Sequence, residues 1–311
     1  MQAVLSFFYK QYKRKKRVRG ANAVPLTPEQ EEEEQLEHAA TPEEDELADA
    51  MAADAAEEAA SVPAARLEDD AHQTNTVRDQ AIREMCAKGV TFSASQEKQA
   101  LGVMPKVSGL ARRVHDSSSV LKPAFERIVA STPGLPSDRK ALTRLVKTRW
   151  NSEYACLDDH LELRVAVEKL TSEFSMSLGA YRLTEPQWRL AGELCDVLGI
   201  FVPITEYFSR KETPLVMEVL ERLEDVIGAL KLARDTTNSF PPLSPVTRVA
   251  AHAGFLVGTK YMELLKQCEV YQIAIVLSPD RKLQWFKTRN YSAADIDAIR
   301  ERVVARWEAS Y

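Results

Sequence analysis

The sequence has few of the residues that build disulfide frameworks, metal knuckles or phosphate loops. Its four cysteines are too far apart for a Cys-x-x-Cys knuckle or a dense disulfide framework, and this spacing favours a reducing compartment. The eleven glycines are dispersed, and none lies in the strand–turn–helix context of a nucleotide-binding loop. The five histidines have no second ligand at metal spacing, so we expect neither a metal site nor another cofactor.

The sequence also lacks a long hydrophobic run. Its longest clean apolar stretch lies around residues 273–277, whereas a membrane-spanning helix needs roughly 18 apolar residues or more. The first nine residues are apolar, but no positive residue precedes them and no small-residue cleavage site follows, which argues against a signal peptide. We therefore expect no membrane partner, and no small-molecule substrate is evident.

Acidic and basic residues are segregated along the chain. Residues 1–28 hold seven basic residues and no acid, and residues 29–70 hold seventeen acids against Arg66 alone. The remainder has 33 basic and 29 acidic residues, so the net charge of -5 comes from one tract. We expect a basic N-terminal segment (1–28), a disordered acidic linker (29–75) and a helical domain (76–311). The linker is too charged and too poor in branched and aromatic side chains to order by itself.

The acidic linker has an alternative interpretation as an interaction tail for a protein partner. The basic segment before it contains one compact run that is typical of a nuclear-import signal or a phosphate-binding patch, although an exposed solvated segment has the same composition. Nuclear localisation is therefore a hypothesis, and it depends on Lys13, Arg14, Lys15, Lys16 and Arg17.

From about residue 76 onward, apolar residues recur at helical spacing, which predicts an all-α domain. Two amphipathic helices are expected around 103–114 and 121–129, with a break at 116–119. Thr184, Ser244 and Ser292 each precede a helical pattern as an N-cap. The last helix is expected to hold Ile296, Ile299, Val303 and Trp307 on one side. Residues 271–277 are the one strand candidate, and they equally fit a buried helical turn.

Asp158, Asp159 and His160 resemble a carboxylate pair for a divalent ion. Adjacent helical positions point about 100° apart, so the two carboxylates should diverge and face solvent. Phosphoryl chemistry with two metals needs carboxylates from separate rigid elements, and no strand is predicted to hold them.

The window 139–152 is basic and contains no acid. Its cations could contact a nucleic-acid backbone, and its tryptophan could stack on an unpaired base. A tryptophan at the head of an amphipathic helix more often packs in the core, so both interpretations stay open. The candidate DNA-binding residues are Arg139, Lys140, Arg144, Lys147, Arg149, Trp150 and Asn151.

The run Lys147-Thr148-Arg149-Trp150-Asn151-Ser152 resembles the "TRWNS" segment of hAT-superfamily DNA transposases. Residues 270–286 resemble that family's "ALVLDPRYKLxYF" segment, with Ser278 where the family usually has aspartate. The similarity covers about residues 76–311.

This resemblance implies a helical insertion of an RNase H-like transposase. The family's metal-binding carboxylates lie on the core that the insertion interrupts, and we find no counterpart for them, so no enzyme activity is expected unless a core is supplied elsewhere. By resemblance, Trp150 acts near a DNA end and Arg149 contacts a phosphate, so the implied partners are DNA and other transposase-derived chains. The alternatives are a helical interaction scaffold without DNA binding and a gene fragment without function.

Overall fold

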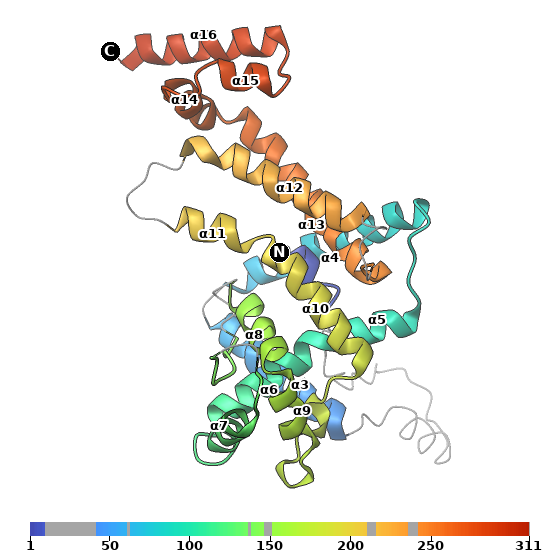
Figure 1. Cartoon of the computed structure of the whole chain (residues 1–311). Coiled ribbons are helices and arrows are strands. Elements are labelled where there is room, and N and C mark those ends of the chain that lie inside the picture. The colour runs from blue at the N-terminus through green and yellow to red at the C-terminus, as the bar shows by residue number, and fades with distance from the viewer. Residues whose placement is uncertain are drawn as a thin grey trace. The chain divides into compact units, whose positions relative to one another are not determined.

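The computed structural model describes residues 1–9, 42–60, 63–135, 138–145, 151–209, 216–235 and 242–310. Within these ranges every regular element is a helix and no strand occurs, so the predicted all-α class is confirmed (Figure 1). The strand candidate is helix α14. The α-helices are α1 (Gln2–Leu5), α3 (Pro42–Ala59), α4 (Ala64–Ala87), α5 (Ala94–Leu101), α6 (Val103–Asp116), α7 (Leu121–Ser131), α8 (Asn151–Glu162), α9 (Arg164–Ser172), α10 (Glu185–Gly199), α11 (Val202–Phe208), α12 (Val219–Asp235), α13 (Pro245–Gln267), α14 (Glu269–Leu277), α15 (Gln284–Thr288) and α16 (Ala293–Ser310).

The chain folds into two compact units. Unit 1 consists of Met1–Val4, Thr76–Thr91 and Asp196–Tyr311, and unit 2 consists of Leu5–Asn75 and Phe92–Cys195. Residues 76–311, expected to form one helical domain, are divided between the two units. The chain passes from one unit to the other four times, between α4 and α5 and within α1, α4 and α10, and the three crossings within helices have no boundary signal in the local sequence.

Helix α6 is central to the core of unit 2, where it packs against α3, α7 and α8. Its predicted apolar face is buried, and the predicted break before α7 is confirmed. Gly109 of α6 leaves room for Tyr181 of the short 3-10 helix η2 (Gly179–Tyr181), because a Cβ atom at Gly109 would lie 2.5 Å from Cε1 of the ring. Tyr181 is fully buried, and burial raises the pKa of its hydroxyl.

The expected disordered linker does not extend to residue 75. Residues 42–59 form α3 and the chain from residue 64 onward forms α4, while 29–41 lie outside the described residues. Tertiary packing explains the difference, because an apolar or small face can order a helix that its own sequence would not. Leu47 is buried, Ala50 lies close to Gly109, and the carboxylate of Glu46 lies 3.6 Å from Nε of Arg113 on α6.

The first residues of the chain also belong to the core. Residues 1–9 fall in the predicted basic N-terminal segment, yet Phe7 and Phe8 are fully buried in unit 2. The ring of Phe7 makes an edge contact with Phe92, and the carbonyl of Phe8 accepts a hydrogen bond from the Met104 amide. The apolar character of this stretch is therefore explained by packing.

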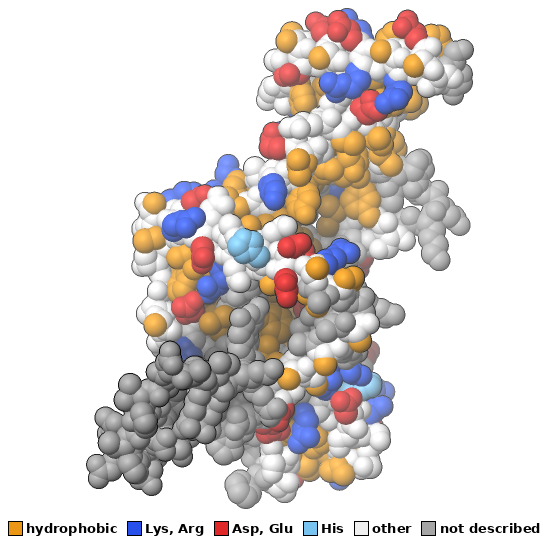
Figure 2. Space-filling model, turned by 180° about the vertical axis from the view of Figure 1, so that it is seen from behind, with side chains coloured by type: hydrophobic (Ala, Val, Ile, Leu, Met, Phe, Trp, Pro, Cys, Tyr) orange, Lys and Arg blue, Asp and Glu red, His pale blue; other side chains and the backbone are white. Residues whose placement is uncertain are grey.

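In unit 1, helices α12 and α13 lie side by side along much of their length (Figure 1). The C-terminal helices α14, α15 and α16 add a second buried cluster around Ile275, Trp285 and Phe286. On the face seen in Figure 2, these C-terminal helices carry basic and acidic side chains interspersed with each other. That face of the C-terminal helices therefore has no extended surface of one charge.

The predicted helix starts are confirmed. Ser244 caps α13 by accepting a hydrogen bond from the Thr247 amide at 3.4 Å. Ser292 and Asp295 exchange reciprocal hydrogen bonds at the start of α16, and Gln187 accepts a hydrogen bond from the Thr184 amide before α10. These contacts are local in sequence, which is why a pattern of neighbouring residues predicts them.

Only the first turns of the apolar side predicted for the last helix are buried. Ile296 and Ile299 are buried, whereas the side chain of Trp307 is 63% exposed. The later turns of α16 contact α14 through polar side chains, since Arg302 donates to Gln272 and Arg306 pairs with Glu269. Within the described ranges, no helix has both the length and the apolarity that a membrane crossing requires.

Candidate nucleic-acid interface

The candidate interface is built from residues 138–145 and the start of α8, all within unit 2. Residues 138–145 have no regular secondary structure, but Leu142 and Leu145 are buried. These two side chains hold the segment on the body of the unit. An irregular segment fixed in this way can present its remaining polar side chains in a defined position.

Arg139 forms the main polar contact between this segment and α8. Its two terminal nitrogens donate to two carboxylates, at 3.0 Å to Asp159 Oδ1 and 2.6 Å to Asp158 Oδ2. The hydrogen bond to Asp158 raises the pKa of Arg139 further above its ordinary value. Asp159 also accepts a hydrogen bond at 2.7 Å from the Thr143 amide. Arg139 is therefore an internal ion-pair partner as well as a surface cation.

The expectation that Asp158 and Asp159 face solvent is wrong. Asp159 is buried, and Asp158 is half-buried and lies 3.9 Å from the Cys195 thiol. The two carboxylates do diverge around the helix axis, but the planar fork of a guanidinium carries separate donors that can reach both. Two diverging carboxylates cannot bind one small ion, but they can bind the two terminal nitrogens of one guanidinium group.

The other predicted DNA-binding residues have different surroundings. Lys140 and Asn151 are exposed, and Asn151 is the first residue of α8. Arg144 is half-buried. Three candidates lie outside the described residues, namely Lys147, Arg149 and Trp150, and so do the five import residues Lys13, Arg14, Lys15, Lys16 and Arg17.

The start of α8 is less basic in space than in sequence. Glu153 lies in the first turn of α8 and is buried. A carboxylate at this position interacts favourably with the helix dipole but repels a phosphate. His160, two turns later, is fully buried, with Nδ1 2.8 Å from the carbonyl oxygen of Cys156. Burial lowers the pKa of His160 to about 4, so its ring is neutral at physiological pH and adds no positive charge.

The second segment that carries the family resemblance, 270–286, lies in unit 1, where its polar side chains form hydrogen bonds and ion pairs. Ser278, the residue that departs from the family pattern, is buried, and its hydroxyl donates to the carbonyl of Ala274. Arg281 is nearly buried and forms ion pairs with Glu218 and, at 3.2 Å, with Glu221. Glu221 also lies 3.2 Å from Arg289.

Sequence reasoning missed this set of ion pairs. A signal was present, because Glu218, Glu221 and Glu224 recur every third residue before and along α12 and so lie near one face. Arg289 contacts Glu224 as well as Glu221, because its Nε lies 3.1 Å from Glu224. Its guanidinium also stacks on the Trp285 ring at 4.0 Å. The partners are sixty or more residues apart in the chain, so spacing alone could not pair them.

Among the described residues, no group of three or more His, Cys, Asp or Glu side chains could hold a metal ion. Comparison of the chain with protein-family models, with curated proteins and with solved structures found no match.

Proposed function

We propose that this chain is a non-enzymatic helical part of a hAT-transposase-like protein that binds nucleic-acid backbones weakly and without sequence preference. The family assignment rests on the resemblance of residues 147–152 and 270–286. We place the binding surface on residues 139–151, of which Lys140 and Asn151 are exposed, with DNA and other transposase-derived chains as the implied partners. Nuclear localisation, through the basic run in residues 13–17, belongs to the same proposal.

One observation carries the binding part of the proposal. Arg139, fixed between Asp158 and Asp159, and the buried Leu142 and Leu145 hold the basic segment in place while Lys140 stays exposed. Ordering a flexible cationic loop on binding costs conformational entropy, and a segment that is already fixed avoids most of that cost. In this arrangement Arg139 positions the segment, and Lys140 contacts the phosphate.

A salt titration tests the proposal. Fluorescence anisotropy of the full chain with labelled duplex and single-stranded oligonucleotides should show binding that falls steeply with ionic strength. If about three cations contact duplex phosphates, the affinity should fall about 40-fold between about 50 and about 200 mM salt. Sequence-scrambled oligonucleotides should bind equally well. Absence of binding at low salt, or binding that salt does not change, contradicts the proposal.

A helical interaction scaffold is the second candidate, and the charge balance around the segment favours it. Among the described residues, the four acids Asp138, Glu153, Asp158 and Asp159 outnumber the three cations of residues 138–145, so the described part of the site has no net positive charge. A Trp150→Ala variant separates the two functions. The scaffold gains support if the variant unfolds, because Trp150 then packs in the core; nucleic-acid stacking gains support if the variant stays folded and loses affinity for single strands.

The localisation part has its own test. A fluorescent-protein fusion of the full chain should accumulate in the nucleus, and replacement of Lys13, Arg14, Lys15, Lys16 and Arg17 by alanine should disperse it. Equal distribution of both fusions contradicts this part and leaves the binding part intact.

A further inference from the structure

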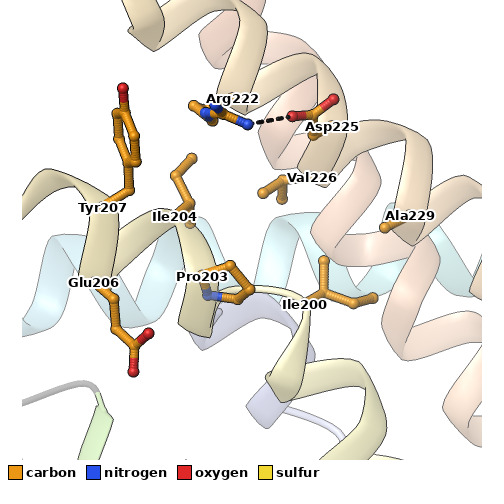
Figure 3. Close-up of a pocket in the computed structure, with 9 residues that line it drawn as sticks. All are labelled: Ile200, Pro203, Ile204, Glu206, Tyr207, Arg222, Asp225, Val226 and Ala229. Atoms are coloured by element: carbon orange, nitrogen blue, oxygen red, sulfur yellow. Dashed lines mark hydrogen bonds and ion pairs between the residues drawn. The ribbon is translucent and has the colours of Figure 1, made fainter. Parts of the chain in front are cut away.

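A cleft of about 570 Å³ lies between α11 and α12, and all of its lining belongs to unit 1. Its floor is apolar and comes from both helices: Pro203 and Ile204 lie on α11, and Val226 and Ala229 lie on α12 (Figure 3). Ile200, just before α11, completes it. A mostly apolar cleft of this size with few polar groups is typical of sites for small organic molecules.

The polar side of the cleft is centred on Arg222. Its guanidinium lies over the Tyr207 ring at 4.8 Å. Its terminal nitrogens lie 3.4 Å from Asp225, the contact drawn as a dashed line in Figure 3, and 3.9 Å from Glu218. Charge-assisted hydrogen bonds are normally about 2.8 Å long, so both contacts are weak. Nε of Arg222 is buried and has no hydrogen-bond partner among the described residues. The buried Nε does not face the cleft, but the two terminal nitrogens, whose contacts are long, keep donor capacity beside the apolar floor.

The surrounding charges limit what this donor can accept. Asp225 and Glu218 already balance the charge of Arg222, and Glu218 is shared with Arg281. The two carboxylates would repel an anionic ligand, whereas a neutral oxygen acceptor carries no net charge for them to repel. A neutral acceptor also leaves the ion pair with Asp225 in place, so no charge has to be left without a partner.

We propose that this cleft binds small, uncharged, mainly apolar molecules that carry one oxygen acceptor, such as an aryl ketone or amide. The apolar body lies on Ile204, Val226 and Ala229, and the oxygen accepts a hydrogen bond from the Arg222 guanidinium. This site is separate from the basic segment of unit 2, and nothing in the sequence analysis indicates it. It requires no covalent chemistry.

The first experiment uses the neutral fluorescent ketone 6-propionyl-2-(dimethylamino)naphthalene with the full chain. We expect saturable binding with a blue shift of its emission, because the dye moves from water to an apolar floor. An Ala229→Phe variant fills the cleft and should weaken binding at least tenfold. Leu232→Phe places the same phenylalanine side chain on the same helix, where the native side chain is 72% exposed, and should leave binding unchanged. Equal binding by the wild type and Ala229→Phe overturns the proposal.

The acceptor part is tested with charge and donor changes. The anionic dye 1-anilinonaphthalene-8-sulfonate should bind the cleft more weakly than the ketone, and Arg222→Met, which keeps an unbranched apolar stem but removes the donors, should weaken ketone binding several-fold. If the anion binds this cleft more tightly, or Arg222→Met binds the ketone as well as the wild type, the proposed ligand class is wrong.

A measurement on the unmodified protein covers the case in which Ala229→Phe fails to fold. In methyl NMR spectra of the full chain, titration with the ketone should shift the resonances of Ile200 and Ile204, with Ile204→Val used for assignment. Unmoved signals from these two residues at saturating ketone overturn the proposal without any cleft-filling variant.

Discussion

The two units differ in how they hold their buried charged and titratable groups. Unit 1 pairs side chain with side chain, as in Arg281 with Glu218 and in His252 with Glu84, whose Nε2 and Oε2 atoms lie 2.8 Å apart. In unit 2, His160 and Asp159 are held differently: His160 lies beside the Cys156 carbonyl, and Asp159 is held by the Thr143 amide and by the half-exposed Arg139.

This difference predicts different weaknesses. A buried charge pair fails when one partner is removed, because the other charge remains in a low-dielectric environment. A buried neutral histidine without a carboxylate fails when acid protonates it. Unit 1 should therefore be the more sensitive to loss of a single side chain, and unit 2 the more sensitive to low pH.

Removal of Arg281 should give the largest effect. The Arg281 side chain is 12% exposed and that of Glu218 is 11% exposed, so Arg281→Ala leaves a buried carboxylate without its closest partner. We expect a loss of about 3–5 kcal/mol in the free energy of unfolding. Urea denaturation followed by circular dichroism measures it. Arg300→Ala, which removes a surface pair with Asp297, is the control and should change stability by less than about 0.5 kcal/mol.

The double variant Arg281→Met with Glu218→Gln sharpens the same point. It removes both charges, so its loss should be well below that of Arg281→Ala. A loss as large as that of the single variant would mean that packing, and not the buried charge, governs this part of unit 1.

Acid should destabilise unit 2 through His160. The unfolded residue takes up a proton near its ordinary pKa of about 6.5, whereas the folded residue does so only at about 4. The unfolded state therefore binds more protons between these values, and stability is lost as the pH falls from about 6.5 to about 4, by about 3 kcal/mol at most. Carboxylates also titrate near the lower limit, so the wild type must be compared with a variant.

His160→Asn is the matched variant, because its amide nitrogen stands where Nδ1 stands and can still donate to the Cys156 carbonyl but does not titrate. The difference between the two stability curves should shrink toward low pH as the wild type loses stability. A constant difference between pH 7 and pH 4 would exclude His160 as the source of acid sensitivity. In unit 1, Glu84 opposes the effect of burial on His252, whose pKa is nevertheless lowered by that burial.

Loss of the Arg139 fork should have an intermediate effect. The Arg139 side chain is 39% exposed, so solvent screens its ion pairs, and Arg139→Ala should cost about 1–2 kcal/mol. Arg139→Lys keeps the charge but cannot donate to both carboxylates in one plane, so it should recover less than half of the loss. Full recovery by lysine would show that charge alone, without the fork geometry, holds the segment.

Local patterns in the sequence predicted the helices and their caps. They could not predict the ion pairs between residues that are far apart in the chain. The caps at Ser244 and Ser292 join residues three apart, so their spacing is visible in the sequence. The Arg139 and Arg281 ion pairs join residues 19–20 and 63 apart, and only tertiary packing brings them together. For the same reason the window 139–152, which has no acid in sequence, has Asp158 and Asp159 beside it in space.

The smallest expected effect is on nucleic-acid affinity. It tests whether the cations of residues 139–151 bind a phosphate backbone although Asp158 and Asp159 lie beside them. Lys140 is exposed, and the fixed position of Arg139 beside it implies different roles for the two residues. Lys140→Ala should weaken binding several-fold and reduce the slope of log affinity against log salt by about 0.9 for duplex DNA. Arg139→Ala should weaken binding without reducing the slope, because Arg139 positions the segment and contacts no phosphate. Lys260→Ala, an exposed lysine of unit 1, is the control and should change neither value. If Arg139→Ala reduces the slope as Lys140→Ala does, Arg139 contacts phosphate directly and its pairing with α8 opens on binding.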